Sequence, residues 1–321
     1  MTELSVLIPF VPRRLEQVLP FAGLVNWTSA ARLWQGQSMV LEPHQTFVGV
    51  AGAGFRVPAG LGVTLMPLRN PFEAATQARS VALATGHPVT AGFGTGAVQF
   101  QRNILGSAYS SPLNTARAYV TAVRSLLDGE LVQSDGTEFT LTGQLPPAVA
   151  PRVDVGLGVL RPGMARLAGE VADAVITWLT PPSYLKDVLV PAVAEGMKKA
   201  GRTRRPRIIA MVPVGVRRDE TDPERLALAS NLAHLQAPHY QDMLRRAGAD
   251  IGDGNDVHQA ARAVVDTGGF VTGDLDDVLK GLDAYQQAGA DEIVLNTTGV
   301  NKMFGSPEAL ADLRTILKAH Q

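Results

Sequence analysis

The sequence predicts a (β/α)8 barrel, and three observations lead to this prediction. Eight short apolar runs, each of the length of a buried strand, alternate with segments whose apolar residues recur at helical spacing. The chain has 321 residues, a length that suits one barrel-type domain. No Gly-x-Gly-x-x-Gly motif follows the first apolar run, which disfavours a dinucleotide-binding doubly wound sheet. We therefore expect a single barrel domain over residues 1–321, with a hairpin insertion at about 130–145 and a helical insertion at about 218–268.

The predicted strands are short, rich in β-branched and other apolar residues, and bounded by glycine, proline or polar clusters. In chain order they span residues 4–9, 32–34, 60–65, 89–93, 153–157, 174–178, 207–214 and 292–296.

The predicted helices are marked by capping residues followed by proline or by acidic residues. Asn70 precedes Pro71, with Glu73 three positions after the cap, and Ser111, Asp222 and Asp274 start later helices in the same way. Ser306-Pro307-Glu308 is predicted to cap the last helix. The helical segments expected from this pattern are 14–25, 46–51, a helix opening at 70–73, 111–128, 163–172, 183–200, 222–246, 257–265, 274–289 and one from 306 onward.

A different pattern interrupts the alternation between the fourth and fifth strands. Polar and apolar residues alternate over 131–141 around the pair Asp135-Gly136, a combination typical of a tight hairpin turn. We therefore expect a small β insertion there.

Composition excludes several classes of function. The chain carries 29 basic and 30 acidic residues, for a net charge of −1, so nothing indicates a nucleic-acid partner. Cysteine is absent, which excludes disulfides and thiolate catalysis and fits a cytoplasmic protein. The N-terminal residues lack the basic segment of a signal peptide, and no apolar run is long enough for a membrane span.

In a barrel of this kind the active site lies at the carboxyl ends of the strands, which selects candidate residues directly. These positions hold no carboxylate, histidine or lysine, so they offer neither the facing carboxylates of glycosidases nor the ligands of a metal site. A mouth lined by glycine, threonine, glutamine and apolar groups suits a large flat cofactor that brings its own reactivity. The candidates are Pro9, Phe10, Gln35, Gln37, Ser38, Thr64, Leu65, Met66, Gly94, Thr95, Gly96, 158–163, Thr177, Trp178, Thr180 and 296–301.

The turn that follows the fifth strand is also typical of an anion site. Gly156 and Gly158 allow close approach of a ligand to the backbone, and Pro162 fits the first turn of a helix. Free amides at such a helix start favour an anion, although an ordinary structural turn has the same pattern.

Among the six histidines, only His44 is expected near the mouth, as a functional group. His87 precedes a strand at the opposite end of the barrel, and His320 is terminal. Surface or capping roles are expected in the helical insertion for His234, His239 and His258. Trp178 is expected either in the core or as a stacking platform.

Three segments carry a resemblance to a known family. They are GLGVTLMPLRNPFEAATQARSVALATGHPVTAGFGTG from residue 60, LRPGMARLAGEVADAVITWLTPPSYL from residue 160 and AGADEIVLNTTGV from residue 288. In this order they resemble the third-to-fourth strand region, the fifth-strand phosphate turn and the eighth strand of the bacterial luciferase-like flavin-dependent oxidoreductases. Members of that family bind FMN or the deazaflavin coenzyme F420 across the strand ends.

The resemblance implies roles for individual residues. The end of the third strand would back the flavin-type ring, in a region where the family often has a non-prolyl cis bond, and glycines after the fourth strand would border the ring. The Leu-Arg-Pro-Gly-Met turn is more similar to the deazaflavin branch, so F420 is favoured over FMN. The cofactor-binding residues implied are Val63, Thr64 and Leu65 for the ring, Gly94, Thr95 and Gly96 at its border, and Gly158, Val159, Leu160 and Arg161 for the phosphate.

The chain also departs from the family pattern. Several deazaflavin members carry Asp-His after the second strand and Glu after the fourth, whereas this chain has residues 35–38 (QGQS) and 97–99 (AVQ) there, which disfavours a sugar-phosphate dehydrogenase. Gln37, Ser38 and His44 are the expected catalytic hydrogen-bond donors toward a substrate carbonyl.

We therefore expect a reductase that uses reduced F420 to saturate an activated C=C or C=N bond. The substrate would be a small molecule or a modified peptide, as in natural-product tailoring. The alternatives are an FMN-dependent monooxygenase and a non-catalytic barrel subunit, and the family resemblance allows a homodimer through residues 15–33.

Overall fold

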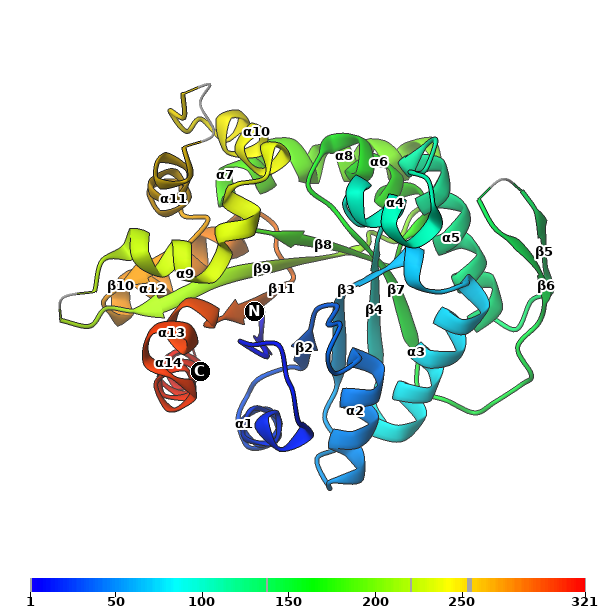
Figure 1. Cartoon of the computed structure of the whole chain (residues 1–321), viewed down its shortest axis with the longest axis horizontal. Coiled ribbons are helices and arrows are strands. Elements are labelled where there is room, and N and C mark those ends of the chain that lie inside the picture. The colour runs from blue at the N-terminus through cyan, green and yellow to red at the C-terminus, as the bar shows by residue number, and fades with distance from the viewer. Residues whose placement is uncertain (1, 137, 220, 253–255, 321) are drawn as a thin grey trace.

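Eight parallel strands close into a barrel in the computed structural model, which describes residues 2–136, 138–219, 221–252 and 256–320 (Figure 1). Around the barrel the hydrogen-bonded order is β1-β2-β3-β4-β7-β8-β9-β11, and β11 pairs with β1 to close the ring. All of these pairings are parallel, as expected for strands joined by helical crossovers. The predicted (β/α)8 TIM-barrel fold is confirmed.

Every strand predicted for the barrel is present, with ends that shift by up to two residues. The barrel strands are β1 Glu3–Leu7, β2 Leu33–Gln35, β3 Ala59–Leu65, β4 Val89–Gly94, β7 Val153–Gly158, β8 Ala174–Trp178, β9 Arg207–Val216 and β11 Glu292–Asn296. A further short strand, β10 Val271–Gly273, pairs with the end of β9 outside the ring. The sequence analysis missed β10, because three residues carry too little periodicity to be recognised.

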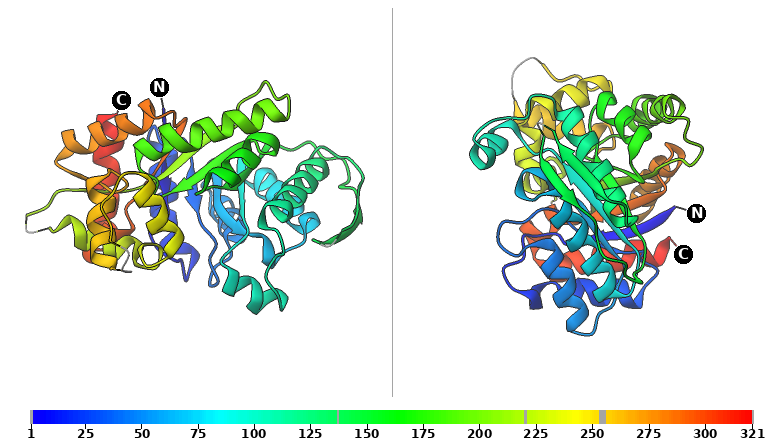
Figure 2. Two further views of the ribbon diagram at one scale, coloured as in Figure 1. Left: turned by 90° about the horizontal axis from the view of Figure 1, so that it is seen from above. Right: turned by 90° about the vertical axis from the view of Figure 1, so that its right-hand side faces the viewer.

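Helices surround the barrel, and most begin with proline in the first turn, where the missing amide costs no hydrogen bond (Figures 1 and 2). They are α1 Leu19–Trp27, α2 Pro43–Gly52, α3 Pro71–Thr85, α4 Val98–Leu105, α5 Pro112–Leu127, α6 Pro162–Val171, α7 Pro182–Tyr184, α8 Val190–Lys199, α9 Pro223–Leu235, α10 Pro238–Arg246, α11 Val257–Asp266, α12 Leu275–Gln287, α13 Thr298–Phe304 and α14 Ser306–Ala319. Short 3-10 turns cover Leu15–Gln17 and Met66–Leu68, and a π-helical turn covers Leu185–Leu189.

Four predicted helix caps are confirmed by hydrogen bonds. Asn70 accepts from the Phe72 amide at 3.0 Å, and the side chains of Ser111, Asp222 and Asp274 cap their helices in the same way. The cap predicted for Ser306 is wrong. The residue before α14 is Gly305, and the hydroxyl of Ser306 donates to Asn301 instead, at 2.8 Å.

The helical predictions need three further corrections. The stretch predicted from 222 to 246 is two helices, α9 and α10, because Pro238 cannot continue a helix and starts a new one. The sequence analysis missed α4, a surface helix in which only Gln101 is buried, and α13, which follows β11 directly.

The predicted hairpin is confirmed as β5 Val132–Asp135 and β6 Thr140–Gly143, and it stands outside the barrel beside α5 (Figure 1). The helical insertion contains α9, α10 and α11. Residue 137 in the hairpin, and residues 220 and 253–255 in the helical insertion, lie outside the described residues.

The amino end of the barrel is closed by a buried carboxylate. Glu292 is fully buried and accepts hydrogen bonds from Ser5 Oγ at 2.6 Å and Trp34 Nε1 at 2.7 Å. Its charge is balanced by Arg32 at 3.0 Å and Arg207 at 3.0 Å. A buried charge needs such partners, so this end of the barrel is structural and the opposite end is left for function.

The two chain ends lie close together (Figure 2), and His320 Nε2 is 3.2 Å from the carbonyl of Thr2. Within the described residues, no helix has both the length and the apolar character needed to cross a membrane.

Candidate functional site

The side chain of Val63 lies inside the barrel near the carboxyl end of β3 and packs against three glycines of β4 and β7. A Cβ atom at Gly94 would lie 2.9 Å from Val63 Cγ2, and one at Gly92 or Gly158 would lie 3.0 or 3.3 Å from Val63 Cγ1. Only glycine at these points of β4 and β7 leaves room for the valine. Val63 remains half-buried, so part of its surface is left open at the mouth.

The backbone at this point contains a cis peptide bond between Gly62 and Val63. The family resemblance implied a non-prolyl cis bond in this region, and this bond agrees with it. Thr64 is fully buried, and its hydroxyl donates to the Gly92 carbonyl at 3.1 Å, which ties β3 to β4. Leu65 is half-buried at the end of the strand.

The turn after β4 is held by a side chain that the sequence analysis did not identify. Gln101, from α4, donates to the carbonyls of Thr95 at 3.1 Å and Gly96 at 2.9 Å. Gly94, Thr95 and Gly96 are half-buried, and Gly96 has a φ of +71°, a conformation that favours glycine. This turn therefore forms a small, fixed edge of the mouth.

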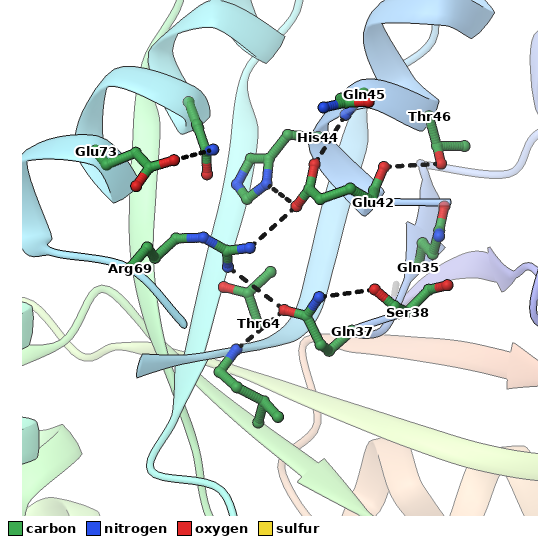
Figure 3. A network of polar contacts seen from close by, with 12 residues as sticks. Gln35, Gln37, Ser38, Glu42, His44, Gln45, Thr46, Thr64, Arg69 and Glu73 are labelled. Atoms are coloured by element: carbon green, nitrogen blue, oxygen red, sulfur yellow. Dashed lines mark hydrogen bonds and ion pairs between the residues drawn. The ribbon is translucent and has the colours of Figure 1, made fainter. Parts of the chain in front are cut away.

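A chain of hydrogen bonds runs from the end of β3 to the start of α2 (Figure 3). The backbone amide of Gln37 donates to the Val63 carbonyl at 3.0 Å. The side-chain oxygen of Gln37, Oε1, accepts from the backbone amide of Leu65 at 3.3 Å and from the guanidinium of Arg69 at 3.4 Å. The guanidinium of Arg69 pairs with Glu42 at 3.2 Å. Three segments that are separate in sequence are thus joined at one edge of the mouth.

The chain of hydrogen bonds ends in a partly exposed carboxylate, Glu42, paired with the buried His44. Glu42 Oε1 lies 2.7 Å from His44 Nδ1, and its other oxygen accepts from the Gln45 amide at 3.1 Å. Burial raises the pKa of Glu42, but the hydrogen bond and charge of His44, the Gln45 amide and Arg69 outweigh burial and hold that pKa below 4.5. Glu42 is therefore ionised near neutral pH, and it holds the Nδ1 proton of His44.

His44 Nε2 has no hydrogen-bond partner among the described residues, and the side chain is 4% exposed. The sequence analysis identified His44 and Gln37 but missed Glu42. The signal for Glu42 was its position before Pro43, because an acidic residue at that place caps a helix. Ser38 is buried, and its hydroxyl accepts from the Val40 amide at 3.1 Å within its own loop.

The turn after β7 leads into the first turn of α6, where the sequence analysis predicted a phosphate site, and one of the residues named for that site has an engaged amide. The amide of Val159 donates to the Ile176 carbonyl at 2.8 Å, so it is not available to a ligand. The first turn of α6 contains no acidic residue, and no side chain caps it. The amides of Gly163 and Met164 lie in that turn, where amides have no intrahelical partner.

Two more of the predicted phosphate residues have other contacts. The Leu160 carbonyl accepts from the Tyr184 hydroxyl at 3.2 Å, which fixes the turn. The guanidinium of Arg161 is exposed at the start of α6 and lies 3.2 Å from Asp242 of α10. Arg161 therefore places an ion pair with Asp242 at the start of α6.

Aromatic residues form the wall of the mouth next to β8. The ring of Trp178 lies 5.3 Å from the ring of His234, which in turn contacts Tyr240 edge-on at 5.1 Å. Burial, with a smaller contribution from His239, lowers the pKa of His234 to about 4, so the ring is neutral near pH 7. The surface or capping role predicted for His234 is therefore wrong, because the fold of α9 brings it against Trp178.

A cavity of about 300 Å³ lies beside the mouth, between the end of β3, α4, α5 and the hairpin. Glu138 from the hairpin and Tyr109 line it, and Glu138 accepts a hydrogen bond from the Thr115 hydroxyl. Burial, with the nearby charge of Glu138, raises the pKa of Tyr109 to about 12. The residues that border the cavity thus include one acidic residue, Glu138, one basic residue, Arg69, and several hydroxyl groups. Among the described residues no three histidine or acidic side chains are grouped so as to hold a metal ion.

Comparison with known proteins agrees with this geometry. The model of the luciferase-like monooxygenase family matches residues 9–292. Over 146 residues, 46% of this chain, the sequence is 33% identical to a 5,10-methylenetetrahydromethanopterin reductase from Methanolobus tindarius. That alignment spans 44% of the relative, so the chain matches less than half of its length.

Two solved structures are similar to the whole fold. An F420-dependent secondary alcohol dehydrogenase in complex with an F420–acetone adduct has a TM-score of 0.75 at 18% identity, with 98% of this chain and 99% of the other covered. The monooxygenase RslO1 from Streptomyces bottropensis has a TM-score of 0.74 at 15% identity, with 98% of both chains covered. The chain belongs to the luciferase-like monooxygenase family.

Proposed function

We propose that this member of the luciferase-like family is an oxidoreductase that uses coenzyme F420 and acts as a reductase. The reaction would transfer a hydride from reduced F420 to an activated C=C or C=N bond. The partial match to a methylenetetrahydromethanopterin reductase and the fold shared with an F420-dependent dehydrogenase support this choice of cofactor.

One observation carries the proposal: the mouth combines an apolar platform with an anion site on the neighbouring strand end. Val63 rests on glycines of β4 and β7, and β7 leads directly into the open first turn of α6. A flat ring against Val63 and a phosphate at the amides of Gly163 and Met164 would use both features. Bound F420 would supply the hydride chemistry, which no side chain at these strand ends provides.

The hydrogen-bonded chain would hold the ring edge and manage a proton. Gln37 fixes the end of β3 through both its backbone amide and its side-chain oxygen. Arg69 links Gln37 to Glu42. The ionised Glu42 engages Nδ1 of His44, which leaves Nε2 as the ring nitrogen without a partner among the described residues. We propose His44 as the proton carrier of the site, with Glu42 as its positioning residue.

The substrate would be a small molecule or a modified peptide, as in natural-product tailoring in the cytoplasm. The cavity of about 300 Å³ beside the mouth gives room for a group that extends past the cofactor. The segments after β2 and β4 lack the Asp-His and Glu of the sugar-phosphate dehydrogenases, which supports a different substrate class.

The second candidate is an FMN-dependent monooxygenase, supported by the family and by the fold shared with RslO1. The observation in its favour is that α6 offers amides that suit the phosphate of either cofactor. A third alternative, a non-catalytic barrel subunit, has no specific observation in its favour.

We also propose a homodimer through residues 15–33. Trp27 of α1 is 75% exposed, an unusual position for so large an apolar surface. Analytical ultracentrifugation of the wild type and of Trp27→Lys tests this. A monomeric wild type would contradict it.

The test of function is a set of fluorescence titrations with F420, FMN and the deazaflavin riboside that lacks the phosphate. We expect F420 to bind most tightly and the riboside at least tenfold more weakly. Reduced F420 should then be consumed in the presence of unsaturated substrates. A preference for FMN would favour the monooxygenase, and binding of neither cofactor would leave only the non-catalytic alternative.

A further inference from the structure

Two buried side-chain amides at the mouth have an N–H₂ group with no partner in the part of the chain that the structure describes, and chemistry fixes the orientation of each amide. Asn231 Oδ1 lies 3.2 Å from Trp178 Nε1. An indole N–H can only donate, so the oxygen of Asn231 must face it. Asn231 Nδ2 is consequently the buried atom without a partner, and the residue is 1% exposed.

Asn296, the last residue of β11, is in the same situation. Its Oδ1 accepts from the amide of Thr298 at 3.0 Å, and a backbone amide can only donate. Nδ2 of Asn296 therefore also faces no partner, and this residue too is 1% exposed. An unpaired buried donor costs about 1–3 kcal/mol, so two such groups call for an acceptor that the described residues do not provide.

Both groups belong to the same wall of the mouth. Val294 lies in the cluster that fills the barrel interior, and Asn296, two residues on, faces the same way. Trp178 packs against that cluster from β8, and β9 alone separates β8 from β11 in the sheet.

Helix α9 connects the two sides of this wall, since it contacts both Trp178 at the end of β8 and α13 after β11. A Cβ atom at Gly299 of α13, three residues after Asn296, would lie 3.4 Å from Ser230 Cβ, and the next residue, Asn231, contacts Trp178. The helical backbone is broken at Asn231, where φ is −135° and ψ is 23°.

The wall is uncharged near neutral pH. His234, whose ring is tilted against that of Trp178, has its pKa lowered to about 4 by burial, and burial raises the pKa of Tyr240 above its usual value. The guanidinium of the nearby Arg161 is paired with Asp242. Two neutral N–H donors on an aromatic wall match an uncharged carbonyl oxygen better than a carboxylate or a phosphate, whose charge would need a cation.

We infer that Asn231 and Asn296 form a carbonyl-binding pair opposite the glycine-lined side of the mouth. If the chain is the proposed reductase, its substrate would carry an uncharged ketone, ester or amide carbonyl beside the unsaturated bond. Only this statement about the substrate rests on the proposed function. Such a carbonyl is also what activates a C=C bond toward hydride.

The test uses the full-length protein labelled with ¹⁵N at the asparagine side chains, and cyclohexanone as the probe. We expect the N–H₂ signals of Asn231 and Asn296 to shift together and to saturate, while that of the exposed Asn103 stays in place. Asn231→Asp and Asn296→Asp identify the two signals. Cyclohexanecarboxylate should bind at least tenfold more weakly than cyclohexanone.

The same variants test the affinity. Replacing either amide by a carboxylate keeps the acceptor but removes the N–H₂ group, so the dissociation constant for cyclohexanone should rise at least tenfold. Ser230→Ala, which removes a neighbouring buried hydroxyl that is also unpaired, should change it less than twofold. Circular dichroism checks that each variant is folded.

Signals of Asn231 and Asn296 that stay in place with cyclohexanone, both with and without F420, would overturn the inference and leave buried water as the partner. An equal effect of Ser230→Ala would overturn it as well. If the probe shifts both signals but F420 does not bind, the carbonyl pair stands and the reductase proposal fails.

Discussion

The imidazole of His44 and the carboxylate of Glu42 are held together at 2.7 Å, under the loop that joins β2 to α2. Only one of the two imidazole nitrogens is engaged, since Nε2 has no partner among the described residues. The carboxylate is shared with Arg69, which links the pair to Gln37 and the end of β3. The pair is therefore linked to the end of β3, although His44 lies in α2 and Glu42 caps that helix.

Glu42→Gln should lower the free energy of unfolding by about 1–2 kcal/mol at pH 7, because it weakens a helix cap and leaves Arg69 without its counter-charge. The pKa of Glu42 is lower in the folded protein than in the unfolded chain, so its contribution is present above pH 4.5 and disappears as the pH falls through the folded value. Urea unfolding from pH 3 to 7 should show a flatter acid limb in the variant. The exposed Glu130→Gln is the control, and identical limbs for Glu42→Gln and wild type would contradict the prediction.

Gly94→Ala should weaken F420 binding by at least tenfold. The added methyl would lie 2.9 Å from Val63 Cγ2 and push the valine into the space of the cofactor ring. Fluorescence titration measures the effect. Gly52→Ala is the matched control, because a Cβ there would meet nothing within 4 Å and should leave binding unchanged. Equal affinities for both variants would remove Val63 from the proposed cofactor site.

Gly163→Asp should have opposite effects on stability and on binding. An acidic side chain in the first turn of α6 favours the helix by about 0.3–1 kcal/mol, and a Cβ here meets only Leu113, at an ordinary 3.7 Å. The same charge should repel a phosphate and weaken F420 binding at least tenfold, with little effect on the deazaflavin riboside. Gly163→Ala is the control. If the variant binds F420 and the riboside with equally reduced affinity, the phosphate does not bind at the first turn of α6.

His234 should make the protein less stable in mild acid. Its folded pKa of about 4 lies below the unfolded value near 6.5, so the unfolded chain binds the extra proton between these pH values and stability falls as the pH drops. The loss should amount to about 2 kcal/mol, allowing for partial solvent exposure. His234→Gln should lose less stability over this range in urea unfolding experiments. If the free energy of unfolding depends on pH in the same way in the variant and in the wild type, the ring of His234 is solvated and the prediction is wrong.

Glu292→Gln should lower the free energy of unfolding by about 3–5 kcal/mol, since it leaves the buried Arg32 without its carboxylate and removes one of the two carboxylate partners of the partly exposed Arg207. Glu195→Gln removes an exposed ion pair with Arg166 and should cost less than about 1 kcal/mol. Chemical denaturation compares the two. F420 affinity of folded Glu292→Gln should be unchanged, because Glu292 lies at the closed end of the barrel. A weaker affinity would contradict that separation of structure from function.

The sequence by itself determined the barrel and much of its detail. Strand periodicity located the eight barrel strands to within two residues at either end, and the pairs Asn70-Pro71 and Asp222-Pro223 located helix starts. These features are decided within a few residues, by the alternation of apolar side chains and by the unpaired amides of a first helical turn. The resemblance to the luciferase-like family was carried by such local segments and is confirmed by the family match.

Only the tertiary structure decided which side chains meet at the mouth. The sequence analysis did not identify Glu42, and it predicted a surface or capping role for His234. Arg69, 27 positions further along the chain, pairs with Glu42 and links it to the end of β3. Trp178 of β8 contacts the ring of His234 and so covers it. Contacts between distant segments depend on how strands register and helices pack, and no local pattern encodes which buried donor will be left without a partner.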